Sequence, residues 1–310
     1  MKIVCDAHIP FLVEAVRKGW PEVDICPMKS EEIDSSALRD ADVLVVRTRT
    51  QVNESLLRGT KVKQVCTATI GYDHIDTAYC EAHGIQWSAC PGCNAQAVCD
   101  YIEEALEEFC RQYSAVSIQT IGIVGVGHVG SLVAQMAERK GMKVLLNDPP
   151  KGIGDSLDGI AKNCDIVTFH VPLDDTTFHL CDEAFLAKCK PDALVINASR
   201  GGVVDEQALL RSGRRFVLDT WEGEPHIRPE VLSRAFLASM HIAGYSMEGK
   251  WMAAQMCLDA IATHWGLPPL AAHAPEADGD SARGWLRRIS ETLKARPEDF
   301  EKHRQNYKLR

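Results

Sequence analysis

The chain has 310 residues, of which 45% are hydrophobic and 25% are charged, so it is long enough for two globular domains with separate cores. Its net charge of −9 and the lack of a long basic run disfavour nucleic acid as a partner, and an anionic substrate would need local cations. No apolar run approaches the roughly 20 residues that cross a bilayer, and the opening MKIVCDAHIP is typical of a first strand, not of a signal peptide. We therefore expect a cytoplasmic protein with no membrane partner.

Twelve cysteines are scattered through the chain without the spacing of a disulfide framework, so reduced and mostly buried thiols are expected. Cys90 and Cys93, in CPGC, have the C-x-x-C spacing of a redox pair or of half a zinc site. No second C-x-x-C pair accompanies them, and Pro91-Gly92 indicates a turn. We predict no metal ion and keep a redox pair as the alternative.

Short runs of β-branched and apolar residues occur before residue 90, and helical stretches or turns separate them. This alternation is typical of α/β layers around a parallel sheet. The predicted strands are 2–6, 42–46, 62–69 and 84–89. After the Pro91-Gly92 turn, apolar residues at helical spacing predict a helix over about 94–113, long enough to link two domains.

A second series of apolar runs follows this helix, and each run again precedes a helical segment or a turn. Near-continuous apolar strands suit a parallel sheet that is covered on both faces. The predicted strands are 120–127, 143–148, 165–172, 193–199 and 215–221. A helix over about 247–265 returns to the first domain, and the polar remainder predicts a linker and one or two charged surface helices.

A glycine-rich turn with G-x-G-x-x-G spacing is formed by Gly125, Gly127 and Gly130, between an apolar strand and a helix-forming run. The next strand ends at Asp148, which completes the context of a dinucleotide-binding site. The glycines permit a tight turn, close approach of a pyrophosphate and close helix packing, and the helix N-terminus stabilises the phosphate charge. Asp148 can accept bonds from ribose hydroxyls and would repel a 2′-phosphate. The sequence therefore predicts NAD as the cofactor.

The fold class that these patterns predict is α/β, with two Rossmann-like doubly wound parallel-sheet domains and a cleft between them. Residues 1–93 plus about 247–266 are predicted to form the substrate-binding (catalytic) domain, and 94–246 the NAD-binding domain. Residues 267–310 are predicted to be a linker and a short C-terminal tail, with a reduced dimerisation element as an alternative.

Three further side chains lie on loops expected at the carboxyl ends of the second sheet, where ligands of such folds bind. Arg200 could grip a carboxylate and carbonyl oxygen, His241 could exchange a hydroxyl proton, and Glu224 could orient the imidazole. Hydride transfer to or from a 2-hydroxy acid needs these three roles. Taken singly, each has an ordinary alternative: a surface ion pair, a core histidine and a loop carboxylate.

Several segments resemble the D-isomer-specific 2-hydroxyacid dehydrogenase family, in the same order along residues 1–265. They are VRTRTQVNESLL, CTATIGYDHIDTAYC, PGCNAQAV, TIGIVGVGHVG, NDPP, LDTWEGEP and HIAGYSMEGK. The narrower marks PGCNA, DPP and HIAGY…EGK resemble the branch that oxidises 4-phospho-D-erythronate to the 2-oxo acid in vitamin B6 biosynthesis. That oxidation, with His241 as acid/base and hydride transfer to NAD, is the activity that the resemblance implies.

The resemblance also implies roles for individual residues. The catalytic residues would be Arg200, Glu224 and His241, and the substrate contacts would include Thr48, Thr69 and Tyr245. Cofactor contacts would fall at Gly125, Gly127, His128, Val129, Gly130, Asp148, Val171, Ala198, Ser199, Asp219 and Gly244. For the substrate phosphate, Arg47 and Arg49 flank Thr48 just after a strand and are the candidate cations, with ordinary surface charges as the alternative.

The chain departs from that branch in two places. The loop HVPLDDTTFHL is shorter, and only 45 residues follow residue 265 where the branch carries a C-terminal dimerisation domain, although PEDFEKHRQNY resembles a piece of it. A homodimer is expected from the resemblance. Two alternatives stay open: a relative acting on phosphoglycerate, glycerate or D-lactate, and a non-catalytic protein that senses NAD(H).

Overall fold

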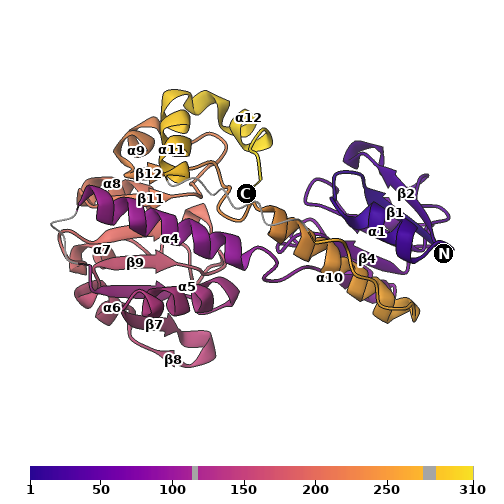
Figure 1. Cartoon of the computed structure of the whole chain (residues 1–310), viewed down its shortest axis with the longest axis horizontal. Helices are drawn as coiled ribbons and strands as arrows, with labels where there is room; N and C mark the ends of the chain where they lie inside the picture. Colours follow the sequence, from indigo (N-terminus) through magenta and orange to yellow (C-terminus); the bar gives the residue numbers. More distant parts are fainter. Residues whose placement is uncertain (114–117, 275–283, 310) are drawn as a thin grey trace. The chain divides into compact units, whose positions relative to one another are not determined.

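The computed structural model describes residues 1–113, 118–274 and 284–309, which form two compact units (Figure 1). The first unit comprises Met1–Asn94 and the described part of Ser246–Ala277. The second comprises Ala95–Tyr245 and the described part of Asp278–Arg310. None of the described helices is long and apolar enough to cross a membrane.

Within the described residues, the first unit holds a five-stranded parallel sheet in the order β2-β1-β3-β4-β5. Its strands are β1 (Lys2–Asp6), β2 (Asp24–Met28), β3 (Val43–Val46), β4 (Gln64–Thr67) and β5 (Gln86–Ser88). One face packs with α1 (Leu12–Gly19) and α10 (Met247–Trp265), and the other lies against the segments of α2 (Glu54–Leu57) and α3 (Thr77–Ala82). A sheet covered on both faces explains why β3 and β4 are buried at every residue.

The described part of the second unit holds a seven-stranded sheet in the order β12-β11-β10-β9-β6-β7-β8, parallel except for β8. The strands are β6 (Thr120–Val124), β7 (Lys143–Asp148), β8 (Ile153–Gly154), β9 (Ile166–Phe169), β10 (Leu194–Asn197), β11 (Arg215–Leu218) and β12 (Leu237–Ala238). The order reverses between β9 and β6, and ligands of such folds bind outside the carboxyl ends of the strands near this reversal.

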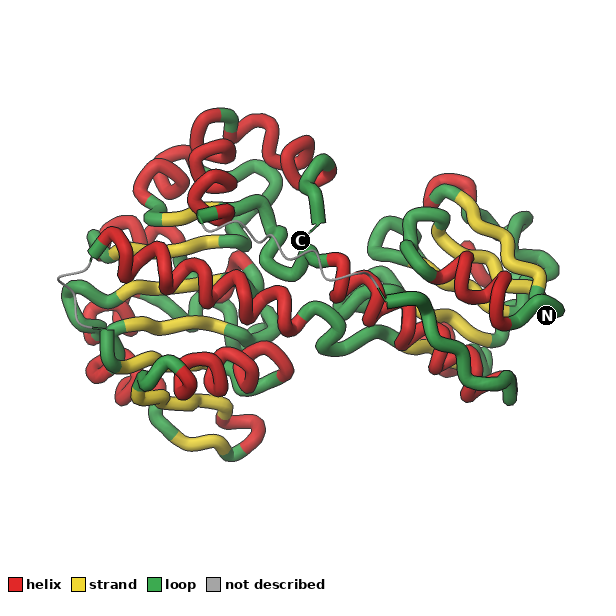
Figure 2. Tube along the Cα trace, viewed as in Figure 1, coloured by secondary structure: helices red, strands yellow, loops and turns green. Residues whose placement is uncertain are grey.

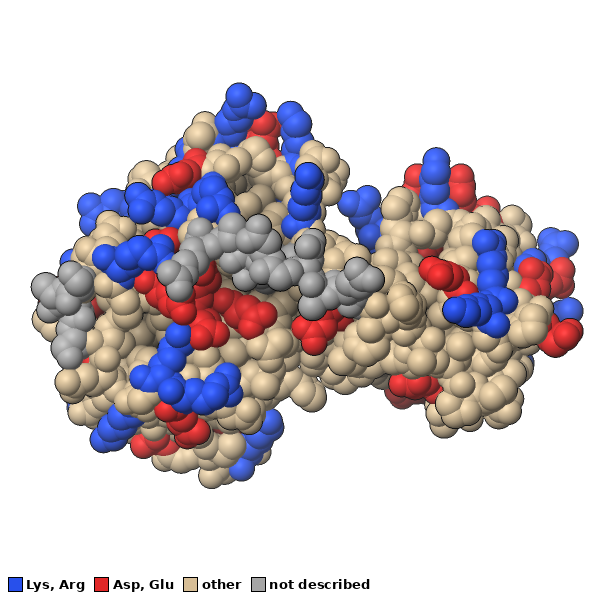
Figure 3. All heavy atoms as spheres, viewed as in Figure 1, with Lys and Arg blue, Asp and Glu red and all other residues tan. Residues whose placement is uncertain are grey.

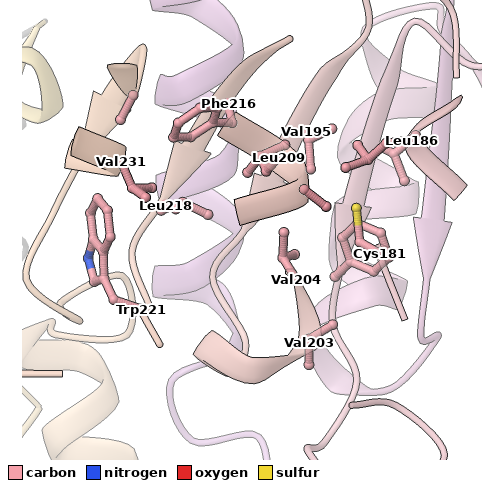
Figure 4. Close-up of a cluster of buried hydrophobic side chains, with 14 of the residues drawn as sticks. Cys181, Leu186, Val195, Val203, Val204, Leu209, Phe216, Leu218, Trp221 and Val231 are labelled. Carbon is pink, nitrogen blue, oxygen red and sulfur yellow. The ribbon is translucent and has the colours of Figure 1, made fainter. Parts of the chain in front are cut away.

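Alternate strand residues of the second unit face two separate cores. Leu194 and Ile196 pack on the side of α4 (Ala95–Gln112) and α5 (His128–Arg139). Val195 packs on the other side, with the four helices α6 (Leu157–Asn163), α7 (Glu183–Lys188), α8 (Glu206–Ser212) and α9 (Pro229–Arg234). Figure 4 shows part of this second cluster, with Trp221 at the end nearest the loops after β11. The period of two along each strand produces this division.

The C-terminal segment packs against the second unit. Its helices, α11 (Trp285–Ala295) and α12 (Phe300–Gln305), can be followed in Figure 2. Helix α11 buries Leu286 and Leu293, and α12 buries Phe300. The hydroxyl of Ser290 accepts a hydrogen bond from the backbone N–H of Ala238 at 3.0 Å, so α11 covers the edge strand β12. The predicted domains left residues 267–310 outside both cores, whereas Ala272 packs in the first unit and 284–309 complete the second.

Candidate active site

The glycine-rich turn follows β6 and leads into α5. Gly125 has φ +91°, and a Cβ there would lie 2.5 Å from the carbonyl oxygen of His170. A Cβ on Gly130 would lie 2.0 Å from the carbonyl oxygen of Gly125, while one on Gly127 would meet nothing within 4 Å. The turn is therefore closed on the protein side and open at Gly127, which fits the close approach of a pyrophosphate.

Asp148 ends β7 beside this turn, and its Oδ2 accepts a hydrogen bond from the N–H of Val126 at 2.8 Å. Lys151 donates to the carbonyl of Val126 at 2.7 Å. On the opposite side, a Cβ on Gly125 would lie 2.8 Å from Val171 Cγ1, so Val171 borders the turn as well. His128 is exposed at the first position of α5, and Val129 is partly buried. The residues present fit a dinucleotide, and their contacts with it stay predictions.

His241 and Glu224 form a hydrogen-bonded pair, with Nδ1 of the imidazole 2.5 Å from Oε1 of the carboxylate. The two side chains are 29% and 26% exposed, so both can be reached from solvent. Burial alone would raise the pKa of Glu224, but the bond to His241, the N–H of Trp221 and the charge of Arg304 together lower it. Glu224 is therefore ionised at neutral pH and fixes the orientation of the ring.

The backbone at His241 is left-handed, with φ +57°, a conformation that residues other than glycine rarely adopt. Asp219, which is 1% exposed, stabilises it: its oxygens accept from the N–H of Ile242 at 2.8 Å and of Ala243 at 2.9 Å. The hydroxyl of Ser239 donates to the same carboxylate at 2.7 Å. Asp219 thus positions the imidazole, a role that the sequence did not reveal, and its predicted cofactor contact stays a prediction.

Arg200 follows β10 and is exposed, with Nη1 donating to the carbonyl of Ser199 at 2.8 Å. Asn197 stabilises the loop that carries Arg200. Its amide nitrogen donates to the Arg200 carbonyl at 2.8 Å, and its amide oxygen accepts from the Ser199 hydroxyl at 2.8 Å. A Cβ on Gly201 would lie 2.1 Å from the carbonyl oxygen of Trp221, so this loop touches the loop that carries Glu224.

The loops of Arg200, Glu224 and His241 follow the neighbouring strands β10 and β11 and the edge strand β12. The structure therefore gathers these three predicted residues at one edge of the second sheet. Ala198 is partly buried between β10 and Ser199, and Gly244 and Tyr245 are partly buried beyond His241. Arg200 can bind a carboxylate, and Glu224 is ionised and orients the imidazole of His241. Together these groups can carry out acid/base chemistry on a hydroxy acid.

The predicted substrate residues of the first unit lie after β3 and β4. Thr48 and Arg49 are exposed, and the hydroxyl of Thr69 donates to the carbonyl of Gly71 at 2.9 Å. Arg47 donates to both oxygens of the buried Asp6, at 2.8 Å and 3.1 Å. Much of the Arg47 charge is therefore offset by Asp6, whereas Arg49 forms no ion pair with any described residue.

The CPGC pair is part of the first unit's core. Cys90 is 1% exposed, and its sulfur lies 3.7 Å from that of Cys257. Burial raises the pKa of Cys93 to about 12, so this thiol is not a reactive thiolate at neutral pH. In the part of the chain that the structure describes, no group of three or more His, Cys, Asp or Glu could hold a metal ion.

Glu206, which sequence reasoning missed, supports the Glu224 loop. Its Oε1 accepts from the N–H of Glu222 at 2.7 Å, and its Oε2 lies 3.5 Å from Nη1 of Arg228. Burial raises the pKa of Glu206 to about 7, and the charge of Glu222 adds to the effect. A single buried glutamate in a helix gave no sequence signal, because only the fold places it under this loop.

Glu206→Gln should stabilise the protein at pH 8 by about 3 kcal/mol, because each unit of pKa difference is worth about 1.4 kcal/mol. The folded protein keeps this proton up to about pH 7, whereas the unfolded chain loses it near 4.5. The native stability therefore falls as the pH rises between these values, and glutamine, which keeps the acceptor oxygen, should remove that slope. Urea unfolding at pH 5 and pH 8 measures it. The exposed Glu183→Gln is the control, and equal slopes in all three proteins would contradict the prediction.

Comparison with known proteins identifies the family. Residues 101–243 match the NAD-binding domain of the D-isomer-specific 2-hydroxyacid dehydrogenases. The chain belongs to this family of enzymes, so the predicted enzyme class and NAD cofactor are confirmed. It is similar over its full length to the erythronate-4-phosphate dehydrogenase of Bacteroides fragilis, with 41% identity over 340 residues and 97% of that relative covered.

Two further comparisons concern length and fold. The erythronate-4-phosphate dehydrogenase of Cronobacter sakazakii is 42% identical over 290 residues, which cover 88% of this chain and 76% of that relative. Since 97% of the Bacteroides fragilis relative is covered, the shorter C-terminal segment does not set this chain apart from all relatives of that name. The NAD⁺-bound 3-phosphoglycerate dehydrogenase of Entamoeba histolytica has a TM-score of 0.70 at 23% identity, over 91% of this chain and 97% of the other. This likeness confirms the predicted α/β fold with two doubly wound sheets.

Proposed function

We propose that the protein oxidises 4-phospho-D-erythronate to 2-oxo-3-hydroxy-4-phosphobutanoate with NAD⁺ as the hydride acceptor. The observation that carries the proposal is the 2.5 Å contact between His241 and Glu224, on a chain that aligns along its whole length with a relative of that name. The family supports the reaction type, and the name of the relatives supports the substrate. We also propose that the protein is a homodimer, as the resemblance implies.

In the proposed mechanism, Arg200 binds the substrate carboxylate, which orients C2 and its hydroxyl. Since Nδ1 of His241 is bonded to Glu224, Nε2 is the nitrogen left to take the hydroxyl proton. The ionised Glu224 stabilises the imidazolium that forms. When bound, NAD⁺ accepts the hydride from C2, so the alcohol loses two electrons and two hydrogens. The proton leaves His241 for solvent before the next turnover.

The test is formation of NADH by the purified protein with 4-phospho-D-erythronate, 3-phospho-D-glycerate, D-glycerate and D-lactate. We expect the highest kcat/KM with 4-phospho-D-erythronate. A clear preference for another member of this panel would replace the proposed substrate while leaving the reaction type intact. Tight binding of NAD(H) without turnover of any 2-hydroxy acid would favour the non-catalytic, NAD(H)-sensing alternative.

A further inference from the structure

Ser239 lies two residues before His241, and each of its polar groups has a partner. Its backbone N–H donates to the carbonyl of Leu218 at 3.0 Å, and its carbonyl accepts from Nε1 of Trp221 at 2.8 Å. Its hydroxyl donates to Oδ1 of Asp219 at 2.7 Å. The residue is fully buried, so bulk water cannot replace these partners. Ser239 is therefore held in one position beside the segment that carries the imidazole.

Through Trp221, Ser239 is connected to Glu224. The backbone N–H of Trp221 donates to Oε2 of Glu224 at 3.3 Å, while the indole of the same residue donates to the Ser239 carbonyl. Trp221 is buried and packs in a core cluster of the second unit. The carboxylate that orients His241 is therefore linked to Ser239 by one buried residue.

Through Asp219, Ser239 is connected to the backbone of His241. The N–H of His241 donates to the Asp219 carbonyl at 2.8 Å, and the Asp219 carboxylate accepts from the next two N–H groups along the chain. These bonds hold the backbone on both sides of a residue whose φ is +57°. Such a conformation persists only where its surroundings fix it, so the direction of the ring toward Glu224 depends on Asp219.

The burial of Asp219 makes the Ser239 hydroxyl important. Acidic side chains are spread over the surface on the face seen in Figure 3, whereas Asp219 is buried. A buried carboxylate is costly unless its oxygens accept hydrogen bonds. Among the described residues, Ser239 is the only one whose side chain donates to this carboxylate, since the other donors are backbone N–H groups. Without that hydroxyl, Asp219 would lose a donor and could move away from the His241 backbone.

The hydroxyl of Tyr101 is the second side-chain partner of the Ser239 hydroxyl. The two oxygens are 2.8 Å apart, and since Ser239 gives its proton to Asp219, it accepts from Tyr101. Tyr101 lies in α4 and is fully buried, and its ring packs edge-on against Trp285 of α11, with 6.0 Å between the ring centres. A buried chain of hydrogen bonds therefore runs from α4 through Ser239 to Asp219.

We propose that Ser239 and Tyr101 are positioning residues of the oxidation: their hydroxyls hold the Asp219 carboxylate, which in turn holds His241 in the orientation that faces Glu224. The inference rests on the proposed function, in which His241 takes the hydroxyl proton. Both side chains are fully buried, so they act through Asp219 and not on the substrate. Their contribution is to keep the imidazole in place for proton transfer without adding to substrate binding.

The test begins with Ser239→Ala and Tyr101→Phe, each of which removes one hydroxyl and little else. The substrate is 4-phospho-D-erythronate, or whichever acid of the panel above the unmodified enzyme prefers. Ser239→Ala should lower kcat by about 10- to 100-fold, because a catalytic group misplaced by about 1 Å costs up to about 100-fold. Tyr101→Phe should lower kcat by about 3- to 10-fold, the loss expected for one hydrogen bond between neutral groups. KM for the acid should change less than about twofold in both variants, since Arg200 lies on another loop.

A variant with both substitutions, Tyr101→Phe and Ser239→Ala, separates the hydrogen-bonded chain from packing. If Tyr101 acts through Ser239, its hydroxyl has no effect on kcat once the Ser239 hydroxyl is gone. The kcat of this double variant should therefore equal that of Ser239→Ala within about twofold, and losses that multiply would overturn the proposed chain. If Ser239→Ala did not fold, Tyr101→Phe would still decide, because an unchanged kcat there would overturn the proposal.

Amide hydrogen exchange of the same proteins measures the positioning without turnover. The N–H groups of Ile242 and Ala243 should exchange faster in Ser239→Ala than in the unmodified protein, because their acceptor, the Asp219 carboxylate, is less firmly held. Tyr101→Phe should show a smaller increase at the same two positions. Unchanged kcat or unchanged exchange in Ser239→Ala would contradict the proposal.

Ser290→Ala is the matched control, since the Ser290 hydroxyl is also buried in the second unit and accepts from the N–H of Ala238 at 3.0 Å. This variant should lose stability but keep kcat within about twofold. A loss of kcat equal to that of Ser239→Ala would overturn the proposal, because any buried hydroxyl of the unit would then have the same effect. Failure of the proposed function has a separate sign: the unmodified enzyme would oxidise no acid of the panel, while hydrogen exchange would still show whether the two hydroxyls hold the His241 backbone.

Discussion

Replacing His241 with asparagine is expected to lower kcat/KM by about a thousandfold, within the range that a general acid/base contributes. Asparagine can occupy the left-handed backbone conformation at this position more easily than most residues, so the loop should keep its form. It has no group that takes up a proton near neutral pH, so the hydroxyl proton has no acceptor. Glu224→Gln should cause a smaller loss, because the amide oxygen still accepts from Nδ1 but no charge stabilises the imidazolium.

Steady-state kinetics with 4-phospho-D-erythronate measures these losses, and fluorescence of bound NADH shows whether cofactor affinity is retained. His264→Asn is the control, because His264 is exposed on α10 and has no part in the proposed chemistry. If His241→Asn kept more than a tenth of the activity, His241 would not be the group that moves the proton. The His241–Glu224 contact would then be structural.

Gly201→Ala is expected to destabilise the second unit by about 3–5 kcal/mol, more than the roughly 1–3 kcal/mol that over-packing usually costs. The added Cβ would lie 2.1 Å from the carbonyl oxygen of Trp221, 2.2 Å from its carbonyl carbon and 2.7 Å from the N–H nitrogen of Glu222. These are backbone atoms, so no flexible side chain can move aside. The Arg200 and Glu224 loops would have to separate, and activity should fall with stability.

Gly154→Ala is the matched control, since a Cβ there meets nothing within 4 Å and the backbone does not have a positive φ. Thermal unfolding should show a Tm lower by on the order of 6–20 °C for Gly201→Ala, since each kcal/mol is worth roughly 2–4 °C in a unit of this size. The control should unfold within about a degree of the unmodified protein. A Gly201→Ala variant with unchanged Tm and activity would show that the two loops are not packed as described.

The parts of the fold that the sequence predicted are those with a strong local pattern. The glycine turn was recognised because a tight turn and close helix packing leave few other residues possible at Gly125 and Gly130. The long helices of 94–113 and 247–265 correspond to α4 and α10 because their apolar spacing is continuous. Strand β2, which contains Pro27 and Asp24, was missed because an edge strand with polar residues has little hydrophobic signal. Strands β8 and β12 were missed as well, because each has only two residues and so no recognisable pattern.

The site was predictable where residue type implied chemistry, and it was not where a role depends on packing. The sequence predicts proton transfer by His241 and orientation of its ring by Glu224, and the structure places the two side chains in contact. Asp219 supports the His241 backbone through three donors, which no spacing could show. Arg304 lies in a charged segment that predicted only a surface helix. Its place beside Tyr245 depends on the burial of Phe300 in a distant core.

Because α11 covers the free edge of β12, removing α11 and α12 would expose an edge strand of the second sheet. Loss of residues 285–309 after proteolysis would leave the N–H of Ala238 without the Ser290 hydroxyl that now accepts its hydrogen bond. An unpaired strand edge is a template for other chains, so the clipped protein should tend to self-associate. Removal of this segment would then expose a strand edge and also take away Arg304, which donates to the hydroxyl of Tyr245.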